Sequence, residues 1–231
     1  MLDVRAGQVV RAVRGERAAY RPVVSALAAG SAPLAIADAL AARTGADVLY
    51  VADLDALQGG ALQVDVLAAL LADRPGRTLW VDAALRDARD AQALAGRFGA
   101  RVRPVFGSES LRDAAALALA GAILSLDSRG GRPLDVSGIG AQPAAWPDTV
   151  IVMTLDRVGA AAGPDLDAFA QWRARAPDRR WIGAGGIRDA SDLAAGAQAG
   201  AHGWLVASAL HDGTLDDSRT REGGRATGRM D

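Results

Sequence analysis

The sequence predicts an α/β protein folded as one TIM (β/α)8 barrel built from two duplicated half-barrels. Eight short apolar, β-branched runs alternate with longer alanine- and leucine-rich stretches of helical period. Such alternation is typical of a parallel sheet covered by helices, and eight strand–helix units fit the length of a barrel domain. In addition, several segments of the first half recur in the same order in the second half. The alternative is an open doubly wound sheet, but no G-x-G-x-x-G follows the first strand.

The elements can be assigned in order along the chain. The first strand ends at Leu2–Asp3, and the other seven are centred on residues 46–53, 78–82, 101–106, 121–127, 149–155, 180–184 and 202–207. Helices are predicted at residues 33–44, 60–73, 87–98, 109–119, 164–175 and 189–199, with a short one near 208–212. We expect a single barrel domain over residues 1–212. Residues 213–231 are polar and rich in Gly, Arg and Asp, which predicts a disordered tail.

Composition excludes several classes of function. The formal net charge is −1, which leaves no basic field for nucleic acid or for an anionic membrane surface. No apolar run of about 18 residues and no signal-peptide pattern is present, so we expect a soluble cytoplasmic protein. Cysteine is absent and all 26 basic residues are arginine. Thiolate and Schiff-base catalysis are therefore excluded, no spacing indicates a zinc site, and no cofactor is expected.

The internal repeat is visible in four pairs of segments. Residues 2–10 (LDVRAGQVV) are nearly repeated at 126–134 (LDSRGGRPL). TLWVDAALRDARD (78–90) matches RRWIGAGGIRDASD (179–192) with one extra residue, an alignment that pairs Trp80 with Trp181. Two further pairs follow: VADLD (51–55) matches VMTLD (152–156), and VFGSESL (105–111) matches LVASAL (205–210). Composition alone can make alanine-rich units look alike, but it does not produce matched R-D-x-x-D segments. We infer a duplicated half-barrel.

Gly185 and Gly186 follow the seventh strand and lead into a helix that starts near Asp189. Bare backbone N–H groups at this position can bind a phosphate, assisted by the positive end of the helix. Ala207 and Ser208, after the eighth strand, would complete the cup. The alternative interpretation is a tight turn that needs glycine for a positive φ.

The corresponding positions in the first half differ. Ala83 and Ala84 replace the two glycines and follow Asp82, so methyl groups and a carboxylate stand where open amides would be needed. Gly107 and Ser108 remain after the fourth strand as candidate substrate contacts. We therefore expect a small phosphorylated substrate, and one with two phosphates would fit badly.

Asp3 and Asp127 end the first and fifth strands and are expected to face each other across the barrel mouth. Two carboxylates can act as acid and base when their environments separate their pKa values. Asp156, near the end of the sixth strand, is a further catalytic candidate, and Asp53 and Asp82 are candidates for substrate binding.

Several carboxylates around one mouth repel each other unless something positive binds. The residues leave four candidates open: a cationic amine, an amidine-like ring edge such as that of a pterin, a divalent metal, or the protein's own arginines. The arginines considered for such a self-neutralised network are Arg5, Arg14, Arg86 and Arg129.

The segment from Arg14 to Arg21 lies between the first strand and the first helix, where a lid would be. Arg14, Arg17 or Arg21 could close on a substrate anion. An exposed charged loop is the alternative.

His202 begins the eighth strand and is expected at the end of the barrel that serves stability and not the site. His211 is expected to cap a short helix. Three tryptophans are assigned to core that faces the helix shell: Trp80, Trp181 and Trp204.

The sequence resembles the histidine-biosynthesis barrels, ProFAR isomerase and its cyclase relative. The features that carry the resemblance are the duplicated half-barrel, the Asp that ends strands one and five, and the glycines after strand seven. The resemblance covers roughly residues 1–212. Three segments are similar to those of an isomerase-like branch of the family found in methanogens and methylotrophs. They are V-R-G-E-R-x-x-Y-R-P (13–22), V-A-D-L-D-A (51–56) and A-S-A-L-H-D-G (207–213). That branch implies a link to synthesis of a one-carbon carrier, tetrahydromethanopterin or methanofuran.

The resemblance also implies where the chain departs from the isomerase. In ProFAR isomerase the acid and base are the strand-one Asp and a strand-six Asp in an R-D-G segment. Here that segment is Arg157-Val158-Gly159, and Val158 cannot transfer a proton. The family's strand-six threonine position is Met153, with Thr154 one place on. The family rearrangement would therefore require Asp156 to have taken over.

Three functions remain open from the sequence. The first is an enzyme acting on a small phosphorylated intermediate of one-carbon carrier synthesis, with Asp3 and Asp127 as acid/base pair. The second is ProFAR isomerase activity. The third is a barrel without catalysis that binds a ligand or a partner subunit, and a homo-oligomer is also open.

Overall fold

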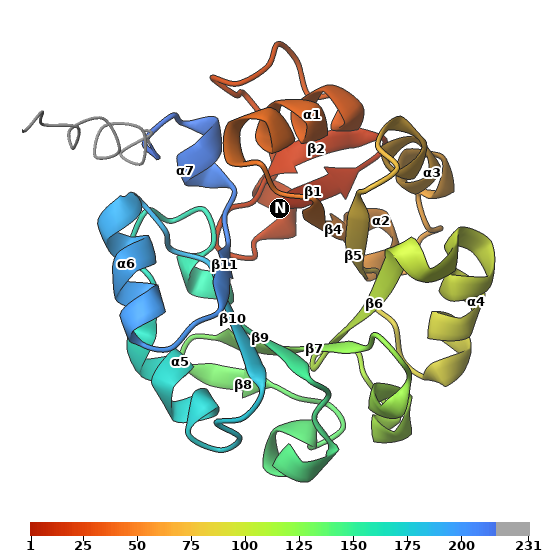
Figure 1. The fold of residues 1–231 in the computed structure, drawn as a ribbon, viewed down its shortest axis with the longest axis vertical. Helices are drawn as coiled ribbons and strands as arrows, with labels where there is room; N and C mark the ends of the chain where they lie inside the picture. The colour runs from red at the N-terminus through yellow and green to blue at the C-terminus, as the bar shows by residue number, and fades with distance from the viewer. Residues whose placement is uncertain (216–231) are drawn as a thin grey trace, which may run out of the picture.

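The computed structural model describes residues 1–215 and confirms the predicted TIM barrel. Viewed down the barrel, the strands form a ring and the helices surround it (Figure 1). The predicted tail falls mainly on residues 216–231, which lie outside the described residues. Eight strands run parallel around the ring: β1 (Leu2–Arg5), β4 (Val48–Asp53), β5 (Thr78–Asp82), β6 (Val102–Gly107), β7 (Ile123–Arg129), β9 (Thr149–Thr154), β10 (Arg180–Ala184) and β11 (Gly203–Leu205).

Neighbouring strands pair in chain order from β1 through β4, β5, β6, β7, β9 and β10 to β11. Between the last and first strands, the Met1 amino group donates a hydrogen bond of 2.8 Å to the Val206 carbonyl oxygen. The helices are α1 (Pro33–Thr44), α2 (Leu54–Leu57), α3 (Val64–Asp73), α4 (Ala88–Phe98), α5 (Leu166–Arg173), α6 (Ala190–Gln198) and α7 (Ser208–His211). The predicted strands and most predicted helices are therefore confirmed, with ends that shift by a few residues.

Alternation along the strands separates two cores, because successive side chains of a strand point to opposite faces. Leu2 and Val4 pack outward with the helix shell. Inside the barrel lies a second cluster that includes Tyr50, Val105 and Ile151. Asp3 lies between Leu2 and Val4 and therefore points inward. The interior is apolar along most of its length, and the carboxylates lie at one end of it.

The repeated segments at residues 2–10 and 126–134 form the same β-hairpin. Strand β1 pairs antiparallel with β2 (Gln8–Arg11), and β7 pairs antiparallel with β8 (Arg132–Leu134). Asp3 lies opposite Val10 in one hairpin, as Asp127 lies opposite Leu134 in the other. Both turns have two residues at positive φ, Ala6–Gly7 and Gly130–Gly131, as a two-residue hairpin turn requires. Neither these hairpins nor β3 (Arg21–Pro22), which extends the first one, is among the strands expected from the sequence.

The second repeat is equally visible in hydrogen bonds. Asp87 caps α4 by accepting from the amides of Arg89 and Asp90, and Asp189 caps α6 by accepting from those of Ser191 and Asp192. The Arg86 amide and Nε both donate to Asp90, and the Arg188 amide and Nε donate in the same way to Asp192. The matched R-D-x-x-D segments thus form the same structure, which supports the inferred duplication.

One detail of the sequence alignment is wrong. Trp80 lies in the barrel interior, with the Arg103 guanidinium 5.5 Å from its ring centroid, whereas Trp181 is fully buried in the shell. The extra residue placed in the alignment shifted it by one position, and such a shift moves a side chain to the opposite face. The structural partner of Trp80 is Ile182, which also faces inward. Trp181 and Trp204 contact the shell as expected.

Two predicted helices differ from the structure. The segment predicted as a helix at 109–119 forms only a short 3-10 helix, Ala114–Ala118. The helix predicted at 60–73 begins at Val64. Its first residues instead form a loop in which the Gln63 amide donates to the Asp53 carboxylate over 2.6 Å. Capping of this loop by Asp53 competes with an earlier start of the helix.

Candidate functional site

Three carboxylates meet in one small cavity in the barrel mouth. Asp3 comes from β1, Asp82 from the end of β5 and Asp127 from β7, and all three line a cavity of about 50 Å³. Each is nearly buried, with exposed fractions of 7%, 8% and 7%. The structure thus brings together the predicted pair, Asp3 and Asp127, and adds Asp82, which was assigned only to substrate binding.

Burial dominates the electrostatics of these groups, since removal from water disfavours the charged form of a carboxyl. It raises the pKa of Asp3 to about 6, with Asp82 adding to the effect and the Met1 amino group and Arg17 opposing it. Burial also raises the pKa of Asp127 well above its usual value, again with Asp82 adding to it and the Ser125 hydroxyl opposing it. At neutral pH, Asp3 is therefore mainly a carboxylate, and burial favours the protonated form of Asp127.

The surroundings of Asp127 fix its position. The Ser125 hydroxyl donates to Asp127 Oδ1 over 2.6 Å. The Asp127 amide donates to Ser108 Oγ over 2.9 Å, and that hydroxyl donates to the Leu134 carbonyl over 2.6 Å. Ser108 is therefore held by the β7–β8 hairpin. At Gly107 a Cβ would lie 3.0 Å from Asp127 Oδ2, so glycine leaves room for the carboxylate.

Asp82 is held by Tyr50, a residue that the sequence analysis missed. The Tyr50 hydroxyl donates to Asp82 Oδ2 over 2.9 Å in the barrel interior. Burial raises the pKa of Asp82 to about 6, with the Tyr50 hydrogen bond opposing it and the Glu109 carboxylate adding to it. Strand alternation could have identified Tyr50, because it shares the inward parity of Ala52.

The loop after β2 covers the mouth through an ion pair. Arg17 Nη2 lies 2.7 Å from Glu109 Oε1, which joins this loop to the segment that follows β6. Arg5 supports the loop by donating to the carbonyl oxygens of Arg17 and Tyr20, and Arg129 donates to that of Gly15. Arg14 is exposed and lines none of the cavities described here. Of Arg14, Arg17 and Arg21, which were the candidates for closing on a substrate anion, Arg17 alone lines the mouth cavity.

The proposed network of self-neutralising arginines does not form around the three carboxylates. Arg5 and Arg129 bind backbone carbonyls, and Arg86 binds Asp90 in the first turn of α4. Arg17 is close enough to favour the charged forms of Asp3 and Asp82, but its hydrogen bond goes to Glu109. Within the described part of the chain, the carboxylates have no arginine hydrogen-bonded to them.

The predicted phosphate cup lies in a neighbouring cavity of about 390 Å³ that includes all four of its residues, Gly185, Gly186, Ala207 and Ser208. Asp3 also lines this cavity, so one carboxylate borders both spaces. The Gly186 amide donates to no backbone carbonyl in residues 1–215, and the residue itself is buried in the wall of the cavity. Asp189 caps the first amides of α6, so the open amides belong to the loop and not to the helix.

Gly186 also meets the requirement of a tight turn. Its φ is +89°, and a Cβ would lie 2.2 Å from the Gly163 carbonyl oxygen. The tight-turn interpretation and the phosphate interpretation are therefore compatible. In the first half, Ala84 takes the equivalent position at φ +55°, and its amide favours the charged form of Asp82.

Two predicted aspartates have structural roles. Asp156 Oδ2 accepts a hydrogen bond from the Gly130 amide in the β7–β8 turn, and Asp55 Oδ2 accepts from the Ala6 amide in the β1–β2 turn. The duplication therefore explains Asp156 as a hairpin anchor, and it does not line the mouth cavity. Asp53 caps α2 by accepting from the Ala56 amide.

Val158 lies where the resemblance implied an aspartate. Its side chain is buried and lines both the mouth cavity and the phosphate-cup cavity. The position next to Asp3 that a carboxylate would need is therefore taken by an aliphatic group. His211 ends α7, and its Nδ1 lies 3.0 Å from Ser25 Oγ, where burial lowers the pKa of the imidazole to about 4.

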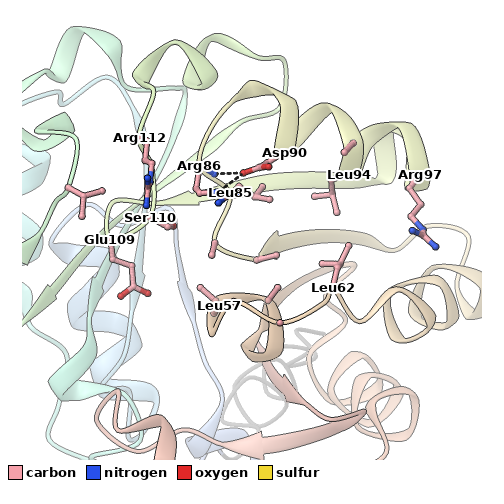
Figure 2. Close-up of a pocket in the computed structure, with 17 residues that line it drawn as sticks. Leu57, Leu62, Leu85, Arg86, Asp90, Leu94, Arg97, Glu109, Ser110 and Arg112 are labelled. Carbon is pink, nitrogen blue, oxygen red and sulfur yellow. Dashed lines mark hydrogen bonds and ion pairs between the residues drawn. The ribbon is translucent and has the colours of Figure 1, made fainter.

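A third cavity, of about 840 Å³, adjoins the mouth on the opposite side. Figure 2 shows Arg86 bonded to Asp90 above Leu57 and Leu62, with Arg97 at the far end from Glu109. Leu57 and Glu109 line both this cavity and the mouth cavity. Arg97 and Arg112 also line it, and neither forms an ion pair with another described residue.

Among residues 1–215, no group of three or more histidine or acidic side chains is arranged to hold a metal ion. In the same residues, no helix combines the length and the apolar character that crossing a bilayer requires.

The raised pKa of Asp82 predicts a stability change. Its folded pKa of about 6 exceeds the ordinary aspartate value of 3.8, so its contribution to stability is present below pH 4 and is lost as pH rises through about 6. Because a pKa difference of one is about 1.4 kcal/mol, Asp82→Asn should increase the free energy of unfolding at pH 7.5 by roughly 1–3 kcal/mol. Urea unfolding at pH 4 and pH 7.5 measures this gain, which should disappear at pH 4.

Asp148→Asn is the matched control, because the Asp148 side chain is 99% exposed. It should leave stability unchanged at both pH values. A loss of stability in Asp82→Asn at pH 7.5 would show that the Asp82 charge is compensated in the folded protein.

Comparison with known proteins agrees with this geometry. A family described as "Histidine biosynthesis protein" matches residues 1–137 and 144–216. An uncharacterized protein of Methanocaldococcus jannaschii, MJ0703, is 25% identical, over 94% of this chain and 93% of that protein. A 1-(5-phosphoribosyl)-5-((5-phosphoribosylamino)methylideneamino)imidazole-4-carboxamide isomerase (ProFAR isomerase) of Xanthomonas campestris is 27% identical, over 93% and 94% of the two chains. The corresponding isomerase of Psychromonas ingrahamii is 27% identical over 74% of this chain and 78% of its own. This chain belongs to the histidine biosynthesis protein family.

Proposed function

We propose that this protein is a cytoplasmic enzyme that acts on a small phosphorylated intermediate by acid–base chemistry at Asp3 and Asp127. The observation that carries the proposal is that Asp3 borders two cavities, one shared with Asp127 and the other with the glycine cup. A substrate whose phosphate lies at Gly186 would extend toward Asp3, which places its reacting carbon between the two carboxyl groups.

The environments of the two carboxyl groups suggest their roles. Asp3, with a pKa of about 6, is the base, because it is mainly ionised at neutral pH. Asp127, whose pKa burial raises well above the usual value, is the acid that returns a proton. The Ser125 and Gly107 contacts hold Asp127 in place for that transfer.

For the biological setting, we propose the synthesis of a one-carbon carrier, tetrahydromethanopterin or methanofuran. The supporting observations are the three segments similar to the methanogen and methylotroph branch, at 13–22, 51–56 and 207–213. The similarity to MJ0703 extends over 94% of the chain and is consistent with the same setting.

ProFAR isomerase activity is the second candidate. It is favoured by the names of the relatives, which specify a substrate with two phosphoribosyl groups. It is also favoured by the third cavity, where Arg97 and Arg112 form no ion pair with any residue in 1–215. It is disfavoured by Val158 beside Asp3 and by Asp82 in the first half. Rescue of a histidine auxotroph that lacks this isomerase would favour it over the first proposal.

Removal of either proposed acid–base group should abolish function in cells. In a strain that lacks the gene, Asp3→Asn and Asp127→Asn should fail to restore growth on a one-carbon substrate, whereas Asp148→Asn should restore it. Loss of a general acid or base lowers turnover by on the order of 10²–10⁴. With the metabolite that accumulates in the deletion strain as substrate, kcat/KM should rise with pH through about 6, where Asp3 loses its proton.

Full rescue by both asparagine variants would contradict the acid–base assignment. If deletion of the gene still stopped growth in that case, a barrel that binds a ligand or a partner subunit without catalysis would be favoured.

The phosphate cup can be tested with inorganic phosphate. Ser208→Asp adds a negative charge to the cup and should weaken phosphate binding at least tenfold by calorimetry, in line with an unfavourable charge contact of about 1.4 kcal/mol or more. Ser110→Asp, which adds the same charge beside the third cavity, is the matched control and should leave binding intact. Equal weakening by the two variants would contradict a phosphate site confined to the second half.

A further inference from the structure

The mouth cavity contains one polar atom that the fold leaves unsatisfied. Asp82 Oδ1 is buried and has no hydrogen-bond partner in the described residues, whereas Oδ2 accepts from Tyr50. The Ala84 amide favours the charged form of Asp82 from nearby, but no donor completes a hydrogen bond with Oδ1. A buried acceptor without a donor is unfavourable for the folded protein, so a ligand that supplies the donor binds more strongly for it.

We propose that Asp82 determines specificity by binding a compact cationic nitrogen group of the substrate, an amidinium or ammonium, through Oδ1. This inference rests on the proposed function, because it assumes that the substrate occupies the mouth. It adds that the part of the substrate opposite its phosphate is positively charged and donates hydrogen bonds.

The charges around the cavity favour a cation over other ligands. Asp3, Asp82, Asp127 and Glu109 all line it, against Arg17, Arg129 and Met1, whose amino group has a pKa that burial lowers to about 6. Arg17 is already bonded to Glu109, and Arg129 to the Gly15 carbonyl. An anion would meet three nearly buried carboxyl groups, and in residues 1–215 the acidic side chains do not form a set that could hold a metal ion. A nitrogen cation supplies both the missing charge and the missing N–H donors.

Tyr50 orients the carboxylate for this contact. Its hydroxyl holds Oδ2, which leaves Oδ1 as the free acceptor, and burial keeps the pKa of Tyr50 well above its usual value, so the hydroxyl remains a donor. In the second half the residue equivalent to Asp82 is Ala184, and the cup there has an open Gly186 amide. The two halves of the duplicated barrel thus differ at this position: one offers a carboxylate, and the other a backbone N–H that donates to no backbone carbonyl in residues 1–215.

The test compares two small probes of the same shape and opposite charge, acetamidinium and acetate. Titration of the wild-type protein, followed by NMR, should give saturable acetamidinium binding with a Kd on the order of 1–10 mM, as suits a four-atom ligand, and no comparable binding of acetate. Asp82→Asn should weaken acetamidinium binding at least tenfold, and Tyr50→Phe should weaken it less. Asp148→Asn, which changes an exposed carboxylate, should leave it unchanged.

If Asp82→Asn does not fold, contacts in the wild-type protein decide the matter. Nuclear Overhauser effects between the acetamidinium methyl group and the Tyr50 ring support the proposal, and effects confined to other residues overturn it. Acetamidinium binding no stronger than that of acetate, or unaffected by Asp82→Asn, also overturns it. If the wild-type protein binds phosphate but not acetamidinium, only this inference is contradicted. If it binds acetamidinium but not phosphate, the proposed phosphate site is contradicted.

Discussion

The burial of three carboxyl groups in one cavity is the constraint on which the rest of the site depends. Water is largely excluded from Asp3, Asp82 and Asp127, and the arginines of the mouth make their hydrogen bonds elsewhere. The folded protein therefore holds protons on these groups at pH values where exposed aspartates have lost them. That is an unfavourable arrangement for stability, and it is also the arrangement that acid–base chemistry requires.

The duplication explains which features are structural and which are specific to one half. Three features occur in both halves. They are the hairpins that begin with β1 and β7, the anchoring of the hairpin turns by Asp55 and Asp156, and the Arg–Asp pairs at α4 and α6. These contacts maintain the scaffold. The differences lie at the mouth, where Asp82 has Ala184 as its counterpart and Ala84 has Gly186. The chemistry is therefore expected where the halves differ, together with Asp3 and Asp127, which both halves retain.

Much of the fold could be predicted from the sequence because strand–helix alternation and the repeat are strong signals. The site was only partly predictable. Strand ends identified Asp3, Asp82 and Asp127, but the same rule also selected Asp53 and Asp156, which bind backbone amides. Sequence position alone does not tell whether a carboxylate after a strand faces the cavity or a neighbouring turn. Trp80 was aligned by residue type instead of by strand face, and Tyr50 was missed because a tyrosine in a strand is usually core.

The central claim is that the fold itself keeps protons on the buried carboxyl groups at the mouth. It is tested most directly by a ¹³C NMR titration of the aspartate side-chain carboxyl groups, with resonances assigned from Asp3→Asn, Asp82→Asn and Asp127→Asn. The account predicts midpoints near pH 6 for Asp3 and Asp82, and a midpoint for Asp127 well above that of an exposed aspartate. Midpoints near pH 4 for all three groups would contradict it.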